Sequence, residues 1–260
     1  MSERYSTGEL LAVLLARDLR DGETGAAGAA ALIPMAAIML ARAMHAPNIQ
    51  IAGEMFVNPR PRQLWDSMLD DRALGTCEAS ETFTELFGHS HRGLDFFFHS
   101  GLQIDAHGNI NLHAIGPWDR PTLRGPGAAN ISYGVRSRRF YITATSHTRR
   151  NFVERVDFVT VPGNLDGPDS RARAGLVREG PRYCLTPRCV FDFDPETLRM
   201  RLRSLHPGHT LEEVVAETGF RFAADPEPAT TVPPSDDELR VLRTVVDPRG
   251  ALAPGRTARH

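Results

Sequence analysis

The stretch LIPMAAIMLARAMHAPNIQIAGE, residues 32–54, indicates the fold class of this chain. Its first part, up to about Met44, is rich in alanine, methionine and leucine and predicts a buried helix. The break HAPN ends that helix, because proline disfavours the helical conformation of the residue before it. The apolar run NIQIA then predicts a strand, and Glu54 follows it directly. Helices that alternate with strands in this way are typical of an open α/β sheet.

The residues before this stretch predict another helix and a turn. Ser6 and Glu9 have the spacing of a capping box, and the leucines that follow form one apolar helical face. The segment DGETGAAG, residues 21–28, is expected to be a tight turn between two helices. Its glycines lack the GxGxxG spacing and no strand precedes them, so no dinucleotide site is predicted.

The residues after Glu54 predict short strands and capped helices. Strands are expected at LDFFF (94–98), in two β segments of GLQIDAHGNINLHAIG (101–116) joined by a turn at 106–109, at RRFYITAT (138–145), at VDFVTV (156–161) and around RLRS (201–204). The capping boxes Thr210/Glu213 and Ser235/Glu238 start two further helices. We therefore expect one α/β domain over 1–222, a Pro-rich linker over 223–235, and a C-terminal helix and tail over 236–260.

Composition excludes several functions. A net charge of −2 gives no attraction to nucleic acid or to anionic membranes. The chain contains no lysine, which excludes Schiff-base chemistry and a Walker-type phosphate loop. The three cysteines are an odd number without zinc-like spacing, so a disulfide framework is not expected and a reducing, cytoplasmic location is favoured. Neither a secretory signal nor a membrane span is expected.

Glu54 and one arginine-rich loop are the candidate sites. Ligands and catalytic groups collect at strand ends of open α/β sheets, so Glu54 is a candidate acid, base or nucleophile, although a solvated loop carboxylate also fits. The loop RPTLRGPGAAN, residues 120–130, combines arginines with glycines and suits a carboxylate or phosphate, or is simply a connection. No metal site is predicted from the histidines, which lack recognised ligand spacing: His89, His91, His99, His107 and His113.

Several segments, taken in order, resemble the β subunits of family I CoA-transferases, the group that includes glutaconate CoA-transferase. They are HAPNIQIAGE, GLQIDAHGNINLHAIG, LRGPG, RRNFVERVDFVTVPGNLDG, VFDFDP and SLHPGHTLEEVVAETGF, and they lie between about residues 22 and 222. The resemblance implies an open, mostly parallel sheet flanked by helices, the NagB/RpiA-like fold of these enzymes. It also implies a partner α-type subunit, in an α2β2 assembly, because the GxGGF motif of α subunits does not occur here.

The resemblance also assigns roles. Glu54 falls at the glutamate that attacks an acyl-CoA thioester and carries CoA as a glutamyl thioester. Coenzyme A thioester is then a substrate, and no tightly bound cofactor is expected. One departure from the family pattern is Met55, where a small residue usually follows the glutamate. The residues expected to bind substrate or CoA are Gly53, Gln103, Asn109, Arg124, Gly125 and Gly127.

Two alternatives remain open. The segments VFDFDP, SLHPG and DDELRVLRTVVDP also resemble two-subunit hydrolases that open a ring of steroid-degradation CoA thioesters. In that branch the chief catalytic glutamate belongs to the α subunit, so this chain would only shape the pocket. A scaffold subunit without chemistry of its own is the other alternative.

Overall fold

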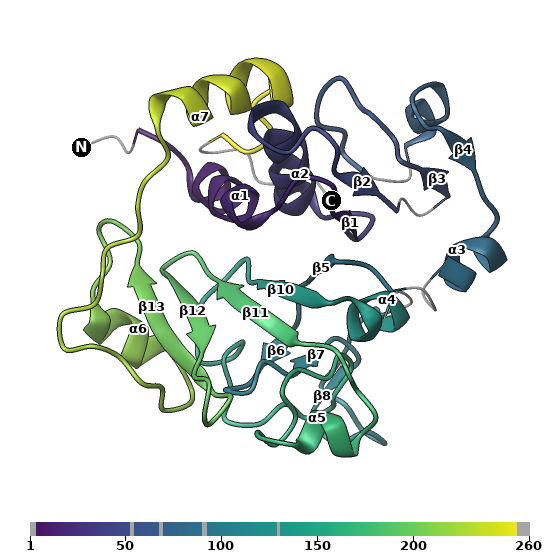
Figure 1. Ribbon diagram of the computed structural model, residues 1–260. Helices are drawn as coiled ribbons and strands as arrows, with labels where there is room; N and C mark the ends of the chain where they lie inside the picture. The colour runs from purple at the N-terminus through teal and green to yellow at the C-terminus, as the bar shows by residue number, and fades with distance from the viewer. Residues whose placement is uncertain (1–3, 53–54, 68–69, 90–92, 129–130, 254–260) are drawn as a thin grey trace. The chain divides into compact units, whose positions relative to one another are not determined.

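The computed structural model describes residues 4–52, 55–67, 70–89, 93–128 and 131–253 (Figure 1). The chain packs as two compact units, one formed by the residues up to Asp95 together with those from Val232 onward, the other by residues 96–231. The expected linker, 223–235, spans the point at which the chain returns to the first unit. None of the helices in the described part is long and apolar enough to cross a membrane.

Helices from both ends of the sequence pack together in the first unit. Helix α1, Thr7–Asp18, begins at the predicted Ser6/Glu9 capping box, and α2 spans Leu32–Met44 as predicted. Helix α7, Asp236–Val241, begins at the predicted Ser235/Glu238 box and continues into the π-helical turn η2, Leu242–Val246. Arg243 donates to both carboxylate oxygens of Glu9, at 2.6 and 3.0 Å, so η2 is tied to the first turn of α1.

The strands of the first unit are short. Strand β1, Thr24–Ala26, pairs in parallel with β2, Gln50–Ile51, and β3, Phe56–Val57, pairs antiparallel with β4, Ala79–Ser80. The short helices η1, Asp71–Gly75, and α3, Phe83–His89, complete this part of the unit. The prediction of a simple turn at 21–28 is wrong, because this segment contains β1, whose backbone pairs with β2. The amide of Gln50 also donates to the carbonyl of Glu23, just before β1.

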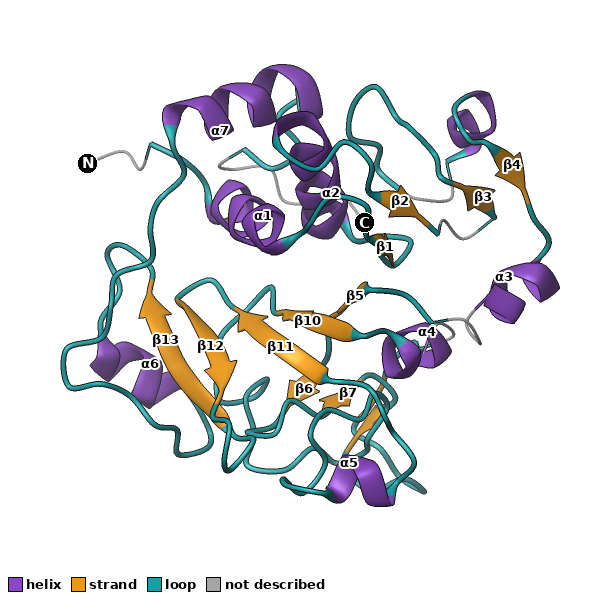
Figure 2. Cartoon of the chain, viewed as in Figure 1, coloured by secondary structure: helices purple, strands orange, loops and turns teal. Residues whose placement is uncertain are grey.

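A sheet with the order β13-β12-β11-β10-β5 forms the second unit (Figure 2). Its strands are β5 (Phe96–His99), β10 (Arg139–Thr143), β11 (Gly180–Leu185), β12 (Cys189–Phe193) and β13 (Met200–Leu205). Strands β5, β10 and β11 are parallel, whereas β12 is antiparallel to both of its neighbours. The predicted α/β class is confirmed.

Helices and hairpins complete this unit. The helices are α4 (Ile131–Arg136), α5 (Ser170–Arg173) and α6 (Leu211–Glu217), the last with the predicted Thr210/Glu213 capping box. Two hairpins, β6 (Gln103–Ile104) with β7 (Ile110–Asn111) and β8 (Ala114–Ile115) with β9 (Leu123–Arg124), are antiparallel. The predicted strand at 156–161 is wrong: this segment is a loop, and only Val161 forms a bridge, to Ile110.

Two buried histidines join the sheet of the second unit to its last segments. The ring of His147 lies 2.9 Å from the Thr186 hydroxyl and 3.0 Å from that of Thr218. The ring of His206 lies 2.9 Å from both the Thr231 hydroxyl and the carbonyl of Thr186. Burial lowers the pKa of each histidine to about 4. Both rings are therefore neutral in the folded protein at pH 7.

We expect stability to fall as the pH drops below about 6.5, the pKa of histidine in an unfolded chain. Between that value and about 4, the unfolded state binds protons that folded His147 and His206 do not. Each ring then lowers the free energy of unfolding by up to about 1.4 kcal/mol for each pH unit. In urea unfolding at pH 7, 6 and 5, His206→Gln should lose less stability across the series than the wild type. The same dependence of unfolding free energy on pH in the variant and the wild type would contradict this account.

Candidate functional site

The predicted nucleophile belongs to the segment that follows strand β2. Gly53 and Glu54 lie outside the described residues, so their predicted roles stay predictions. Their neighbours are described: Ala52 bridges antiparallel to Val57, and the carbonyl of Met55 accepts a hydrogen bond from the amide of Glu81 at 3.0 Å. The chain on both sides of Glu54 is therefore fixed by backbone pairing.

A half-buried arginine on helix α2 fixes the same segment. Its guanidinium, at Arg42, donates to the carbonyl of Ile49 through two nitrogens, at 3.0 and 2.8 Å, and to the carbonyl of Pro59 at 2.8 Å. Burial lowers the pKa of Arg42 to about 10, assisted by the positive charge of Arg60. The guanidinium remains charged at pH 7 and holds carbonyls before and after the Glu54 segment.

Asn58 is the partner of this arginine. The side chain is buried, and the backbone adopts a left-handed conformation, with φ at 48°. Its carbonyl oxygen accepts from Arg42 at 2.5 Å and from the amide of Ile51 at 3.3 Å, while its NH2 group donates to Glu78 at 2.6 Å. Neither Arg42 nor Asn58 was predicted from the sequence. The one local signal is asparagine itself, which tolerates this backbone conformation better than most residues.

Gln103, which is itself bonded to Asn111, ties the hairpin β6/β7 to Asp157 in the loop at 157–160. The Gln103 amide donates to the Asp157 carboxylate at 3.0 Å, and its oxygen accepts from Asn111 at 2.7 Å and from the backbone of Asp157 at 3.0 Å. Asp157 also accepts from the amide of Gly116 at 2.8 Å. The predicted binding residue Gln103 therefore has a structural role here, and its role toward a ligand stays a prediction.

Asn109 lies at the turn of the same hairpin and is fully hydrogen-bonded. Its NH2 group donates to Asp105 at 3.0 Å and to the carbonyl of Leu165 at 2.9 Å. Its oxygen accepts from the amides of Gly163 and Leu165 at 2.9 and 3.1 Å. Burial raises the pKa of Asp105, although hydrogen bonds from Asn109 and His107 oppose that shift. A binding role of Asn109 stays a prediction.

The arginine–glycine loop packs on the end of β7. The amide of Gly125 donates to the carbonyl of His113 at 2.8 Å, and that of Gly127 to the carbonyl of Leu112 at 2.9 Å. A Cβ on Gly125 would lie 2.1 Å from the Leu112 oxygen, and Gly127 has a φ of 70°. Both glycines are therefore required by the backbone. The structure brings them, Arg124 and Gln103 to one region around residues 111–113.

Arg124 is exposed and stacks on an aromatic side chain. Its guanidinium carbon lies 4.9 Å from the centre of the Trp118 ring, and one nitrogen donates to the Trp118 carbonyl at 3.2 Å. Such a guanidinium, held at an open surface, remains able to bind a carboxylate or phosphate. Arg124 was predicted from the sequence, whereas Trp118 was not.

The histidines of the group considered in the sequence have different partners where they are described. His99 is fully buried against Phe97 and Phe140, and burial lowers its pKa to about 3. His113 bonds Thr160 at 2.7 Å. His91 and the side chain of His89 lie outside the described residues. In the part of the chain that is described, no group of three or more His, Cys, Asp or Glu residues is arranged to hold a metal ion.

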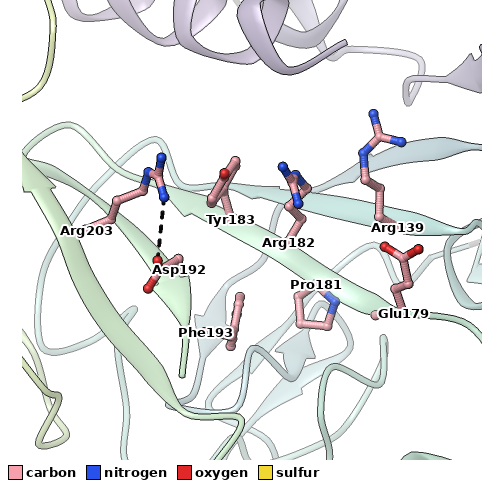
Figure 3. Close-up of a pocket in the computed structure, with 9 residues that line it drawn as sticks. Arg139, Glu179, Pro181, Arg182, Tyr183, Asp192, Phe193 and Arg203 are labelled. Carbon is pink, nitrogen blue, oxygen red and sulfur yellow. Dashed lines mark ion pairs between the residues drawn. The ribbon is translucent and has the colours of Figure 1, made fainter. Parts of the chain in front are cut away.

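A pocket of about 330 Å³ lies on the sheet of the second unit, away from the predicted residues (Figure 3). It is lined by Arg139, Glu179, Gly180, Pro181, Arg182, Tyr183, Asp192, Phe193 and Arg203. Asp192 pairs with Arg201 at 2.9 Å and with Arg203 at 3.7 Å, and the carboxylate of Glu179 accepts from Arg138 at 2.9 Å. The acidic groups of this pocket are thus already neutralised within the chain.

The Coenzyme A transferase family profile matches residues 9–217. The chain is 30% identical to the B-type subunit of 3-oxoadipate CoA-transferase from Pseudomonas knackmussii, over 97% of each chain. It is 29% identical to the B-type subunit of glutaconate CoA-transferase from Acidaminococcus fermentans, over 95% of each. It is also 35% identical to the cholesterol ring-cleaving hydrolase IpdB subunit of Rhodococcus jostii, over 56% of this chain and 57% of that subunit.

Solved structures agree with these matches. Glutaconate coenzyme A-transferase from A. fermentans superposes with a TM-score of 0.85 at 26% identity, covering 96% of this chain and 97% of that one. The decarboxylase AibA/AibB gives a TM-score of 0.81 at 27% identity, covering 96% and 99%. IpdAB of R. jostii gives 0.76 at 26% identity, covering 95% and 96%.

We expect Asn58→Ala to lower the free energy of unfolding by about 2 kcal/mol, because it leaves buried hydrogen-bonding groups of Arg42 and Ile51 unpaired. The left-handed backbone adds strain in alanine. Asn48→Ala is the control, since Asn48 is exposed and its side chain bonds to Asp21 at the surface. Denaturant unfolding of both variants measures the difference, and equal losses would contradict the role given to Asn58.

We also expect Gly125→Ala to be destabilising by about 1–3 kcal/mol, the usual cost of overpacking. The added carbon would meet a backbone oxygen at 2.1 Å and the Leu102 side chain at 2.7 Å. Gly75→Ala is the matched control, because nothing lies within 4 Å of a Cβ at that position. Thermal unfolding distinguishes the two, and a Gly125 variant as stable as the control would show that the loop does not need this close approach.

Proposed function

Because the chain belongs to the coenzyme A transferase family, we propose that it is the B-type subunit of a heteromeric enzyme that moves CoA from an acyl-CoA thioester to a carboxylate. The observation that carries the proposal is the match over nearly the whole length of two relatives, each named as a B-type subunit of a CoA-transferase. Such a match includes both compact units of this chain, so the proposal rests on the whole fold rather than on one motif.

The proposed partner is an A-type chain, in an α2β2 complex. Three observations support a partner: the relatives are named as subunits, IpdAB and AibA/AibB each carry a two-part name, and the sequence lacks the GxGGF motif. Coenzyme A thioester is a substrate in this proposal, and no tightly bound cofactor takes part. The odd number of cysteines argues against a disulfide framework and supports the cytoplasm as the proposed location.

Glu54 is the proposed nucleophile. Its carboxylate attacks the thioester carbonyl and forms a mixed anhydride, and the C–S bond breaks to release CoA thiolate. The thiolate then attacks the glutamyl carbonyl of the anhydride, which forms a glutamyl-CoA thioester and releases the donor acid. The acceptor carboxylate repeats these two steps in reverse order and leaves as the new acyl-CoA, so Glu54 is regenerated.

The anchoring of the flanking chain supports this role. A nucleophile must be held in position, because misplacement by even 1 Å can cost about 100-fold in rate. Arg42 and Asn58 hold the residues on both sides of the Glu54 segment. The charged Arg124 and the amides of its glycine loop are the proposed contacts for the anionic parts of the substrate.

A ring-opening hydrolase subunit is the second candidate. The observation that favours it is the 35% identity to the IpdB subunit, which is higher than that to either transferase subunit but covers 56% of the chain. Met55, where the transferases usually have a small residue, agrees with this alternative. In that case Glu54 shapes the pocket, and water replaces the acceptor acid.

Mass spectrometry of the reconstituted complex distinguishes the transferase from the hydrolase. Incubation with acyl-CoA alone should give CoA attached to the peptide that contains Glu54, and Glu54→Ala should abolish the adduct and lower turnover on the order of 10³-fold or more. Glu212→Ala, at an exposed position of α6, is the control and should change neither. Turnover that needs no acceptor acid and survives Glu54→Ala would contradict transfer and support the hydrolase.

A further inference from the structure

An exposed aromatic cluster on the second unit takes no part in the proposed reaction. Its stacked side chains are Trp118, which is 54% exposed, and Phe158 at 37%, and the two segments that carry them also expose Leu123 at 44% and Val159 at 42%. The other exposed large apolar residues of the described chain come from separate elements or loops: Met44, Leu74, Val177, Val215, Val232 and Val245. Clustered exposed apolar groups mark interaction surfaces, whereas single ones need no explanation.

The cluster is a rigid stack. The rings of Trp118 and Phe158 lie 4.9 Å apart at 25°, and the Arg124 guanidinium lies 4.9 Å from the same indole. His113 supports the stack from 4.9 Å beside Phe158 and is itself bonded to Thr160. These contacts fix the indole before anything binds to it.

The two loops that carry the stack are also fixed to each other. The Asp157 carboxylate accepts from the amide of Gly116, in the loop before Trp118, and from Gln103. The Thr160 hydroxyl accepts from the amide of Leu112 at 2.8 Å. A surface that is ordered in advance loses little conformational entropy when it binds, so its exposed apolar area contributes to affinity.

The geometry of the stack favours a protein, rather than a nucleotide base, as the binding partner of Trp118. A base binds an aromatic side chain by stacking on the ring face. Phe158 stacks on the indole and the Arg124 guanidinium lies over it, each at 4.9 Å, so ring-face area of Trp118 is already used within the chain. Tryptophan and arginine surrounded by smaller apolar groups are typical of the residues that contribute most to protein–protein binding.

We infer that the surface formed by Trp118, Leu123, Phe158 and Val159 binds the A-type subunit. The inference rests on the proposed function, which requires a second chain to complete the site. The surface is continuous with the proposed substrate-binding loop through Arg124, which belongs to that loop and also stacks on Trp118. A partner that closes over this loop therefore meets the indole.

The test is a binding measurement on full-length chains, with the A-type chain of the neighbouring gene as the probe. Trp118→Ser should weaken the association about 30-fold or more, the effect of removing a dominant contact. Val177→Ser, which changes an 87% exposed side chain outside the surface, should bind like the wild type. Circular dichroism and thermal unfolding of the isolated chains confirm that both variants fold, and Phe158→Ser provides a second variant of the surface.

Hydrogen exchange gives an independent readout. In the complex, the amides at 113–124 and 157–160 should become more protected. Wild-type affinity of both surface variants, or unchanged exchange in these segments, overturns the inference. A normal association with a raised KM for acyl-CoA also overturns it, because the surface then binds substrate. Failure of the wild-type chain to bind any A-type chain refutes the proposed function instead, so the two failures are distinguishable.

Discussion

Buried backbone groups in irregular segments must find hydrogen-bonding partners, and this requirement shapes both candidate regions of the protein. A buried amide or carbonyl without a partner costs about 1–3 kcal/mol. Here the partners are planar side-chain groups that bond at two or more points. Arg42 binds carbonyls at 49 and 59, and Asn109 binds backbone groups at 163 and 165. These contacts allow segments without regular structure to be as fixed as strands.

These hydrogen bonds matter for function because they hold the chain around the proposed functional residues in position. The proposed nucleophile, Glu54, and the proposed anion contacts at 120–127 lie between short elements: the described segments on either side of Glu54 contain β2 and β3, and 120–127 contains only the short strand β9. Arg42 of α2 binds the carbonyls of Ile49 and Pro59, which flank the Glu54 segment, and the glycine amides of 120–127 bind the carbonyls of the two residues that follow β7. A substitution in one of these supports is therefore expected to act on the reaction without touching the substrate.

The elements predicted correctly are those whose signals are local, and those that depend on distant partners were missed. The capping boxes at Ser6, Thr210 and Ser235 marked helix starts, because a cap depends on residues only three positions apart. Strand β1, in contrast, exists because β2 pairs with it. Segment 156–161 has the composition of a strand, yet its polar side chains bond to neighbouring loops, so it does not extend a sheet. In the site, Arg124 was identifiable from its loop, whereas Trp118 was not, because stacking is a property of the folded chain.

The proposed chemistry explains why a second chain is needed. An anhydride or thioester on a glutamate is hydrolysed by water unless the site is closed. In the second unit, the arginine–glycine loop carries an exposed guanidinium next to an exposed indole, and nothing in the described part of that unit covers them. The pocket on the sheet has neutralised acids and does not include this loop. In the proposed enzyme, water exclusion over this loop therefore falls to the partner, and a rigid aromatic stack beside the loop is well suited to hold that partner in place.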